Sequence, residues 1–321
     1  MPRSVSDYFI ITLKGLAMGA ADVVPGVSGG TIAFISGIYE ELLSSINGID
    51  LAKLKGLRKN GLKATWQAIN GNFLLALFTG IAISIFSLAK GLKWLLVNKP
   101  ILLWSFFFGL IVASAIYVGK QILKWDVKVI LACIVGLVLS YFITISEPLG
   151  DSENNFYLFF CGAIAVIAMI LPGISGSFIL ILLGAYEVAL GTINNLREGL
   201  FEGDMDKFGS AFIRFLVLAL GGIIGLKLFS KALTWMFEKQ KDLTLAILTG
   251  FMIGSLNKIW PWKETLSTRI NSHGETVPLL QKSISPQAFD GDPKILFAVG
   301  LMVVGFLTIF ILEKIANQSA N

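Results

Sequence analysis

Long apolar runs separated by short polar segments dominate the 321-residue chain. Runs that begin at Phe73, Ile101 and Ile295 approach the roughly 20 apolar residues that a helix needs to cross a bilayer. The pattern predicts six long spans, at about residues 73–97, 101–119, 129–146, 211–237, 243–260 and 295–314. Two other apolar regions, at about 8–46 and 156–193, are interrupted by a Pro-Gly pair. We therefore expect an all-α polytopic membrane protein.

Composition supports this class and removes several others. The chain is 55% hydrophobic and only 15% charged, whereas soluble domains carry about a quarter charged residues. Cys133 and Cys161 lie in apolar runs, and His273 is the only histidine, so we expect no disulfide, metal site or cofactor. The net charge of +5 reflects the sidedness of a membrane protein, and we expect no nucleic-acid partner. The N-terminal apolar stretch is short and has no cleavage region, so we expect no removable signal peptide.

An internal repeat organises the chain. The segment PGVSGGTIAFISGIYE, Pro25 to Glu40, recurs as PGISGSFILILLGAYE, Pro172 to Glu187, with eight of sixteen positions identical. We predict two halves, residues 1–147 and 148–321, each made of one hairpin and three transmembrane helices. Because each half crosses the membrane an odd number of times, the second half should be inverted relative to the first. Inverted repeats with broken helices are typical of secondary transporters.

Basic residues predict the orientation. With a cytoplasmic N-terminus, twelve lysines and arginines fall in inside segments and seven in the longer outside loops. The positive-inside rule therefore favours N-in and C-in.

The Pro-Gly breaks predict two re-entrant hairpins, with Pro25-Gly26 and Pro172-Gly173 at their tips. The returning helices begin at Ser28-Gly29-Gly30-Thr31 and at Ser175-Gly176-Ser177. Serine caps, free amides and the positive end of the helix dipole suit a phosphate or carboxylate. In the alternative interpretation, the serines only cap and the glycines only pack.

Charged residues inside apolar segments are the remaining candidates, because they are costly in a membrane and usually functional. Asp22 precedes the first break and would either couple transport to an ion or pair with a cation. Lys227 should face the central cavity and meet Asp22 or a bound phosphate, and Arg214 is a second candidate for anion contact. Glu40 and Glu187 should lie about 18 Å along the returning helices from the tips, as interfacial anchors or as coupling groups.

The doubled PGVSGG and PGISGS motifs, each followed by Gly-x-Tyr-Glu, resemble those of the polyprenyl-phosphate transporter family, the PopT-like undecaprenyl-phosphate translocases. The resemblance implies a bacterial or archaeal cytoplasmic-membrane flippase that returns undecaprenyl phosphate from the outer to the inner leaflet. It also implies a polyprenyl-phosphate lipid as the partner. A carrier of a small soluble anion is the alternative. A lipid-phosphate enzyme is disfavoured, because the spans lack a histidine or acidic cluster. The driving ion and the oligomeric state, including a homo-oligomer, stay open.

Overall fold

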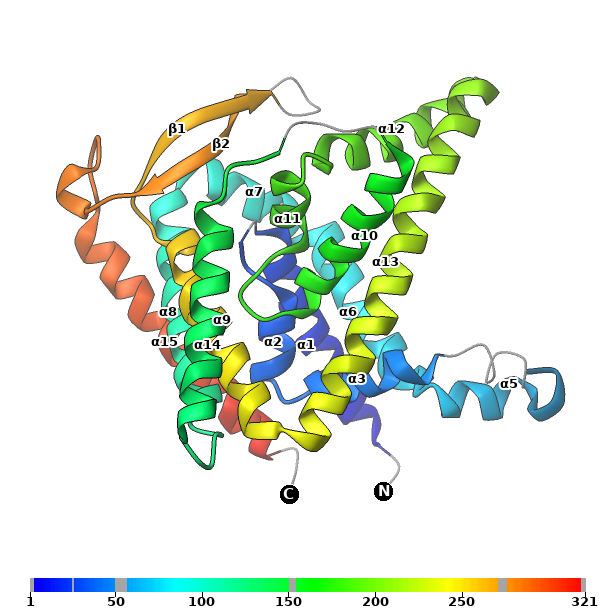
Figure 1. Ribbon diagram of the computed structural model, residues 1–321, viewed down its shortest axis with the longest axis horizontal. Coiled ribbons are helices and arrows are strands. Elements are labelled where there is room, and N and C mark those ends of the chain that lie inside the picture. The colour runs from blue at the N-terminus through cyan, green and yellow to red at the C-terminus, as the bar shows by residue number, and fades with distance from the viewer. Residues whose placement is uncertain (1–2, 25, 50–56, 150–153, 271–275, 319–321) are drawn as a thin grey trace.

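The computed structural model describes residues 3–24, 26–49, 57–149, 154–270 and 276–318 (Figure 1). The first half contains α1 (Val5–Val23), α2 (Gly29–Ile35), α3 (Tyr39–Gly48), α5 (Leu57–Ala68), α6 (Gly71–Ser87), α7 (Ala89–Asn98), α8 (Pro100–Gly119) and α9 (Val127–Ile145). The second half contains α10 (Asn155–Ile170), α11 (Gly176–Leu182), α12 (Tyr186–Glu202), α13 (Met205–Lys239), α14 (Lys241–Ile259), β1 (Lys263–Ile270), β2 (Thr276–Ser283), a 3₁₀ turn (Pro286–Ala288) and α15 (Ile295–Gln318).

The expectation of a helical protein with several apolar helices is confirmed. Among the described residues, α8, α9 and α13 are each long and apolar enough to cross a membrane, and two bent helix pairs add further apolar length. The segment expected as one span over 73–97 is instead divided, because α6 ends at Ser87 and α7 begins at Ala89. Lys90 and Lys93 follow this break, so the second part is less apolar than the first.

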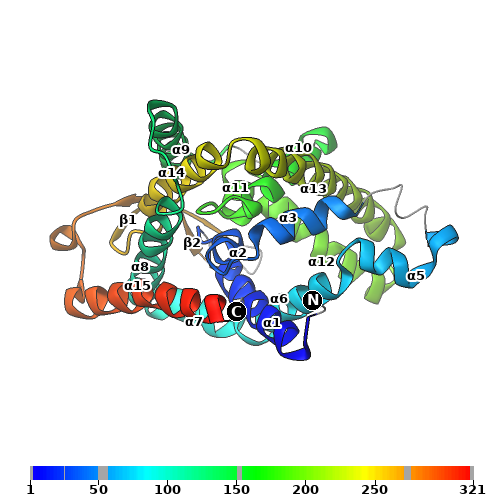
Figure 2. The ribbon, with the colours of Figure 1, turned by 90° about the horizontal axis from the view of Figure 1, so that it is seen from below.

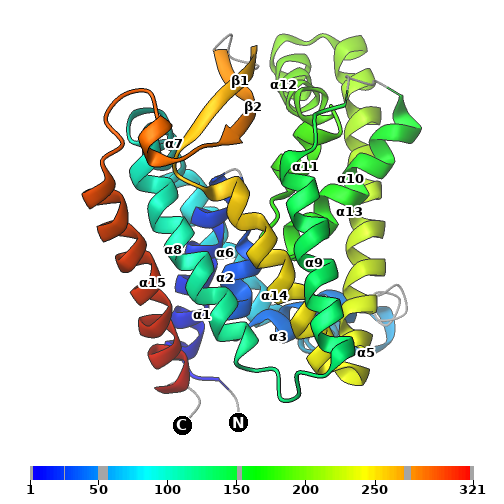
Figure 3. The same cartoon turned by 60° about the vertical axis from the view of Figure 1, so that its left-hand side comes forward.

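A two-stranded antiparallel hairpin, β1 with β2, was not expected. It lies at one end of the molecule, opposite the end that holds both chain termini and α5 (Figures 1 and 3). We call these the β-hairpin end and the termini end. The indole N–H groups of Trp260 and Trp262 donate to the carbonyls of Ile284 and Pro293, at 2.8 and 2.9 Å. These bonds fasten the loop around the strands to the helical body.

Helices of the two halves pack against each other in a crossed pattern. Helix α9 of the first half packs against α14 of the second, and α15 of the second packs against α8 of the first (Figure 2). Glycines permit this close approach. A Cβ added at Gly109 would lie 1.9 Å from the Met302 carbonyl oxygen, and one at Gly250 would lie 2.0 Å from that of Cys133. Small residues at such crossings let helix backbones come together where hydrophobic driving force is weak.

Candidate functional site

Two helical hairpins enter the molecule from opposite ends and meet inside it (Figures 1 and 3). Helix α1 rises from the termini end and α2 returns, whereas α10 descends from the β-hairpin end and α11 returns. Gly26 and Gly173 turn the chain with φ of +90° and +91°, a conformation that favours glycine. Pro172 is buried beside Gly173, and Pro25, the other predicted tip residue, lies outside the described residues. The Pro-Gly motif therefore gives the same turn in both halves.

The tips of the two hairpins are hydrogen-bonded to each other. The Ser28 hydroxyl lies 3.1 Å from the carbonyl oxygens of Met169 and Leu171, and the Gly173 amide donates to the Thr31 hydroxyl at 3.0 Å. Gly30 lets the backbones touch, since an added Cβ would lie 2.3 Å from the Ile170 carbonyl oxygen. The predicted tip residues of α2 therefore form a buried joint between the two hairpins.

Helix α2 already has an anionic group at its first amide. The Gly29 N–H donates to Oδ1 of Asp22 at 2.7 Å, and the Ser28 hydroxyl caps the Gly30 amide at 3.1 Å. A Cβ at Gly29 would lie 2.5 Å from the Asp22 carboxylate. The carboxylate thus occupies the positive end of α2, which is the electrostatically favourable end of a helix for an anion.

Helix α11 begins differently. The hydroxyls of Ser175 and Ser177 share a hydrogen bond of 2.7 Å, and Ser175 also caps the Phe178 amide at 3.4 Å. Met169 takes the place that Asp22 holds in the first half, and a Cβ at Gly176 would lie 3.0 Å from its Cγ. The start of α11 is therefore lined by hydroxyls without a carboxylate from the preceding helix.

The repeated Gly-x-Tyr-Glu motif breaks each returning helix. Gly37 ends α2 with φ +74°, and Gly184 ends α11 with φ +65°. In both places, the amide after the glycine donates to the carbonyl five residues back, as in a Schellman motif. Helices α11 and α12 are consequently bent by 109°. The expectation that Glu40 and Glu187 lie further along the same helices was wrong, because each glutamate follows a second break.

Each copy of the motif lines a cavity. At the termini end, a cavity of about 800 Å³ is lined by Gly37, Tyr39 and Glu40, together with Tyr117 and Lys120 of α8. At the β-hairpin end, a cavity of about 360 Å³ is lined by Gly184, Tyr186 and Glu187, together with Arg269 of β1. The two cavities thus lie on opposite sides of the joint between the hairpins.

The glutamates of the motif differ in their partners. Glu187 forms an ion pair with Arg269, and the guanidinium carbon of Arg269 lies 4.9 Å from the Tyr186 ring centre. Glu40 lies 3.6 Å from the ammonium of Lys241, and both side chains are largely exposed. The smaller cavity is therefore bordered by an ion pair that connects the second hairpin to the β-strands.

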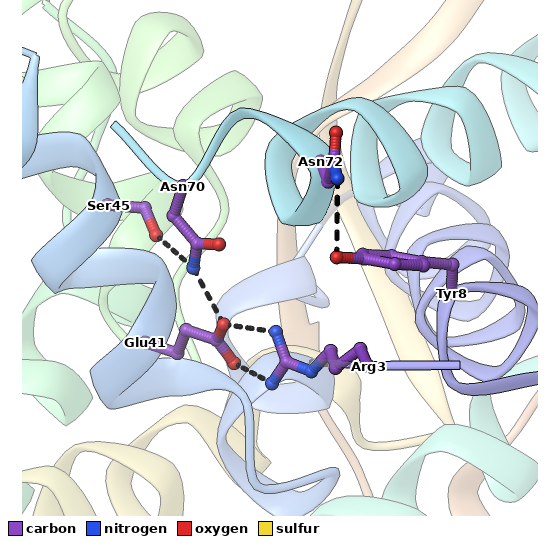
Figure 4. Close-up of polar contacts among 6 residues, drawn as sticks. All are labelled: Arg3, Tyr8, Glu41, Ser45, Asn70 and Asn72. Atoms are coloured by element: carbon purple, nitrogen blue, oxygen red, sulfur yellow. Dashed lines mark hydrogen bonds and ion pairs between the residues drawn. The ribbon is translucent and has the colours of Figure 1, made fainter. Parts of the chain in front are cut away.

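A polar network at the termini end joins the N-terminus to α3 and α6 (Figure 4). Both terminal nitrogens of Arg3 donate to the Glu41 carboxylate, at 2.5 and 2.7 Å, and the carboxylate raises the pKa of the Arg3 guanidinium. Asn70 donates to Glu41 at 2.7 Å and to Ser45 at 3.2 Å. Because Glu41 also lines the larger cavity, this network fixes one of its walls.

The structure places Lys227 at the end of α3 rather than beside Asp22. The Lys227 ammonium donates to the carbonyls of Ile46 and Asn47, at 2.9 and 3.2 Å, where α3 ends. Lys14 does the same at the end of α2, donating to the Ser36 carbonyl at 2.7 Å. A cation at a helix C-terminus is stabilised by the helix dipole, which gives both lysines a structural role. Arg214 is half-buried on α13.

Two further lysines were not selected from the sequence. Lys258, in the last turn of α14, places its ammonium 4.0 Å from the Phe178 ring centre, and its Cγ lies 2.9 Å from the Cβ position of Gly26. Lys263, at the start of β1, lies 3.9 Å above the Trp104 ring. Burial lowers the pKa of Lys263, and the nearby Lys258 charge lowers it further. The presence of Lys258 inside a predicted apolar span was the sequence signal that could have found it.

Comparison of the sequence with known proteins identifies its family. The VCA0040-like family, described as undecaprenyl phosphate translocase-like, matches residues 18–277. The chain belongs to this family. A polyprenyl-phosphate transporter of Vibrio cholerae is 47% identical over 322 residues, covering 99% of this chain and all of the relative. A polyprenyl-phosphate transporter of Staphylococcus aureus is 30% identical over 266 residues, covering 79% of this chain and 86% of the relative. No solved structure matches the chain.

Proposed function

We propose that the protein is a flippase that returns undecaprenyl phosphate, or a related polyprenyl phosphate, from the outer to the inner leaflet. The observation that carries this proposal is the joint between the two hairpin tips, with one cavity on each side of it. Membership of the undecaprenyl phosphate translocase-like family and the names of both relatives support the substrate class. A head group would pass the joint by breaking and remaking its hydrogen bonds.

The two halves act as inverted repeats in this proposal. Support comes from the matching turns at Gly26 and Gly173, the matching helix ends at Gly37 and Gly184, and the entry of the hairpins from opposite ends. The excess of basic residues in the expected inside segments favours a cytoplasmic location for the termini end. The larger cavity would then open inward and the smaller cavity outward, as alternating access requires of a carrier built from inverted repeats.

Only the head group needs protein contacts on this path. A phosphate cannot cross hydrocarbon bare, because burying an unpaired ion costs several kcal/mol or more, whereas the polyprenyl tail remains in lipid. We propose Ser175, Gly176 and Ser177 as donors to the phosphate, since two hydroxyls gather at the start of α11. On α2, Ser28, Gly29, Gly30 and Thr31 would join them only when the hairpin joint opens and Asp22 releases the Gly29 amide.

Reconstitution into liposomes tests the function directly. Labelled undecaprenyl phosphate is placed in one leaflet, and its exposure to a membrane-impermeant phosphatase is followed with and without protein. We expect labelled undecaprenyl phosphate to become accessible to the phosphatase faster in vesicles that contain the protein than in protein-free vesicles. Uptake of inorganic phosphate into the vesicles without lipid transfer would favour the soluble-anion carrier. Absence of both activities in folded protein would contradict the proposal.

A further inference from the structure

Two half-buried lysines, Lys258 and Lys263, have no acidic partner among the described residues. Within the described part of the chain, the Lys263 ammonium is buried and has no hydrogen-bond partner, and no carboxylate lies within ion-pair distance of Lys258. Each ammonium lies over an aromatic ring instead, Lys258 over Phe178 and Lys263 over Trp104. The two lysines come from adjoining segments, the end of α14 and the start of β1.

With both amines protonated, this arrangement leaves positive charge without a carboxylate to balance it among the described residues. An aromatic face attracts a cation, but this attraction is weaker than the loss of hydration on burial. The like charges of the two ammoniums also repel each other, which further destabilises the charged pair. An anion that carries about two negative charges would compensate both ammoniums, and a phosphate monoester carries −1.5 to −2 near neutral pH.

Lys258 also contacts both hairpins. The Lys258 side chain packs against the turn at Gly26, while its ammonium covers Phe178 in the first turn of α11. Phe178 directly follows Ser177, and its amide is capped by Ser175. An anion held by these ammoniums would thus lie close to the hydroxyls at the start of α11, on the side of the β-hairpin end.

We infer that Lys258 and Lys263 form the binding site for the phosphate monoester head group that enters from the β-hairpin end. This inference rests on the proposed function for its direction of entry. It adds two residues that neither the sequence motif nor the helix termini identify.

Ligand-induced stabilisation of the full-length protein in detergent tests the site. Three probes are compared: undecaprenyl phosphate, undecaprenol and inorganic phosphate. We expect undecaprenyl phosphate to raise the unfolding temperature of the wild type and undecaprenol to have no effect. Lys258→Gln and Lys263→Gln should each weaken the apparent affinity for undecaprenyl phosphate at least tenfold. Lys258→Arg and Lys263→Arg, which keep the charge, should retain binding within a few fold.

A matched control is available on the same face. Lys282 is exposed on β2, so Lys282→Gln removes one positive charge without changing Lys258 or Lys263 and should bind as the wild type does. Each variant is first checked for a single elution peak and for its unfolding temperature without ligand. If a glutamine variant fails to fold, the arginine variant and the methionine variant of the same lysine replace it, since methionine keeps the length without the charge.

The outcomes separate the site from the transport function. Stronger stabilisation by the lipid than by inorganic phosphate assigns the site to a lipid head group, and the reverse assigns it to a free phosphate. Equal binding by the wild type and the neutral variants would overturn the inference. If lysine-dependent binding is found but liposomes show no leaflet transfer, the proposed function fails while the site stands. If transfer proceeds at the wild-type rate in both neutral variants, the site fails alone.

Discussion

The Tyr39 hydroxyl donates a hydrogen bond of 3.1 Å to the carbonyl oxygen of Ile170, at the end of α10. Tyr39 is buried and belongs to the repeated Gly-x-Tyr-Glu motif of the first hairpin. Ile170 precedes the tip of the second hairpin. The motif of the first hairpin therefore closes the joint between the hairpins from the termini end.

Replacing Tyr39 with phenylalanine should destabilise this joint. Tyr39→Phe removes the hydrogen bond while keeping the ring contact with Phe34, whose centre lies 5.0 Å away. We expect a loss of about 1 to 3 kcal/mol in the free energy of unfolding, the usual cost of a buried carbonyl left without its donor. Titration with sodium dodecyl sulfate in mixed micelles would measure the change.

The equivalent tyrosine provides the control. Tyr186 is half-buried, and its hydroxyl has no hydrogen bond among the described residues. Tyr186→Phe should therefore leave stability within about 0.5 kcal/mol of the wild type, as is usual for substitutions that break no such contact. Equal losses in the two variants would show that the Ile170 bond does not distinguish them.

The repeat could be found from the sequence because its motif is long and doubled, and the apolar runs predicted most helices. The second breaks, at Gly37 and Gly184, could not, since glycine also occurs within continuous membrane helices. Their positive φ becomes visible only in the structure. The roles of Lys227 and Lys258 depended on neighbours distant in sequence: carbonyls of α3 for the first, and Phe178 for the second.

Asp22 should be needed for stability through its hydrogen bond rather than through its charge. Asp22→Ala leaves the Gly29 amide without its acceptor, which should cost about 1 to 3 kcal/mol. Asp22→Asn keeps a carbonyl oxygen at the same place and should lose less than half as much. Unfolding in mixed micelles measures both variants. If asparagine destabilises as strongly as alanine, the negative charge at the start of α2 is the dominant contribution.

Leaflet transfer by the Asp22 variants tests whether Asp22 couples transport to an ion. Should Asp22 couple movement to an ion, Asp22→Asn would fold normally yet lose leaflet transfer in liposomes. Transfer at the wild-type rate in Asp22→Asn would restrict Asp22 to capping α2. The comparison requires equal amounts of folded protein in the vesicles.

The proposed orientation can be tested with single cysteines in a chain lacking Cys133 and Cys161. Lys282→Cys lies on β2, and Lys124→Cys lies in the turn between α8 and α9 at the termini end; both positions are exposed. A membrane-impermeant maleimide added to intact cells should label Lys282→Cys and should label Lys124→Cys only after the membrane is opened. Labelling of Lys124→Cys in intact cells and of Lys282→Cys only after the membrane is opened would reverse the proposed orientation. Labelling of both cysteines in intact cells would exclude the placement of the two ends of the molecule on opposite sides of the membrane.

The ion pair between Arg269 and Glu187 should restrain the β-hairpin end of the molecule. Arg269 is about one-fifth exposed and Glu187 about one-third exposed, so we expect a modest coupling energy, on the order of 1 kcal/mol. Unfolding of Arg269→Gln, Glu187→Gln and the double variant gives this coupling as a double-mutant cycle. The pair between Arg3 and Glu41 at the other end serves as a reference cycle.

If the Arg269 pair also closes the smaller cavity, breaking it should speed modification of a cysteine placed at Leu279, which lines that cavity. Breaking the Arg3 pair should leave that rate unchanged. Equal modification rates in all variants would mean that the ion pair holds the β-strands in place without controlling access to the cavity.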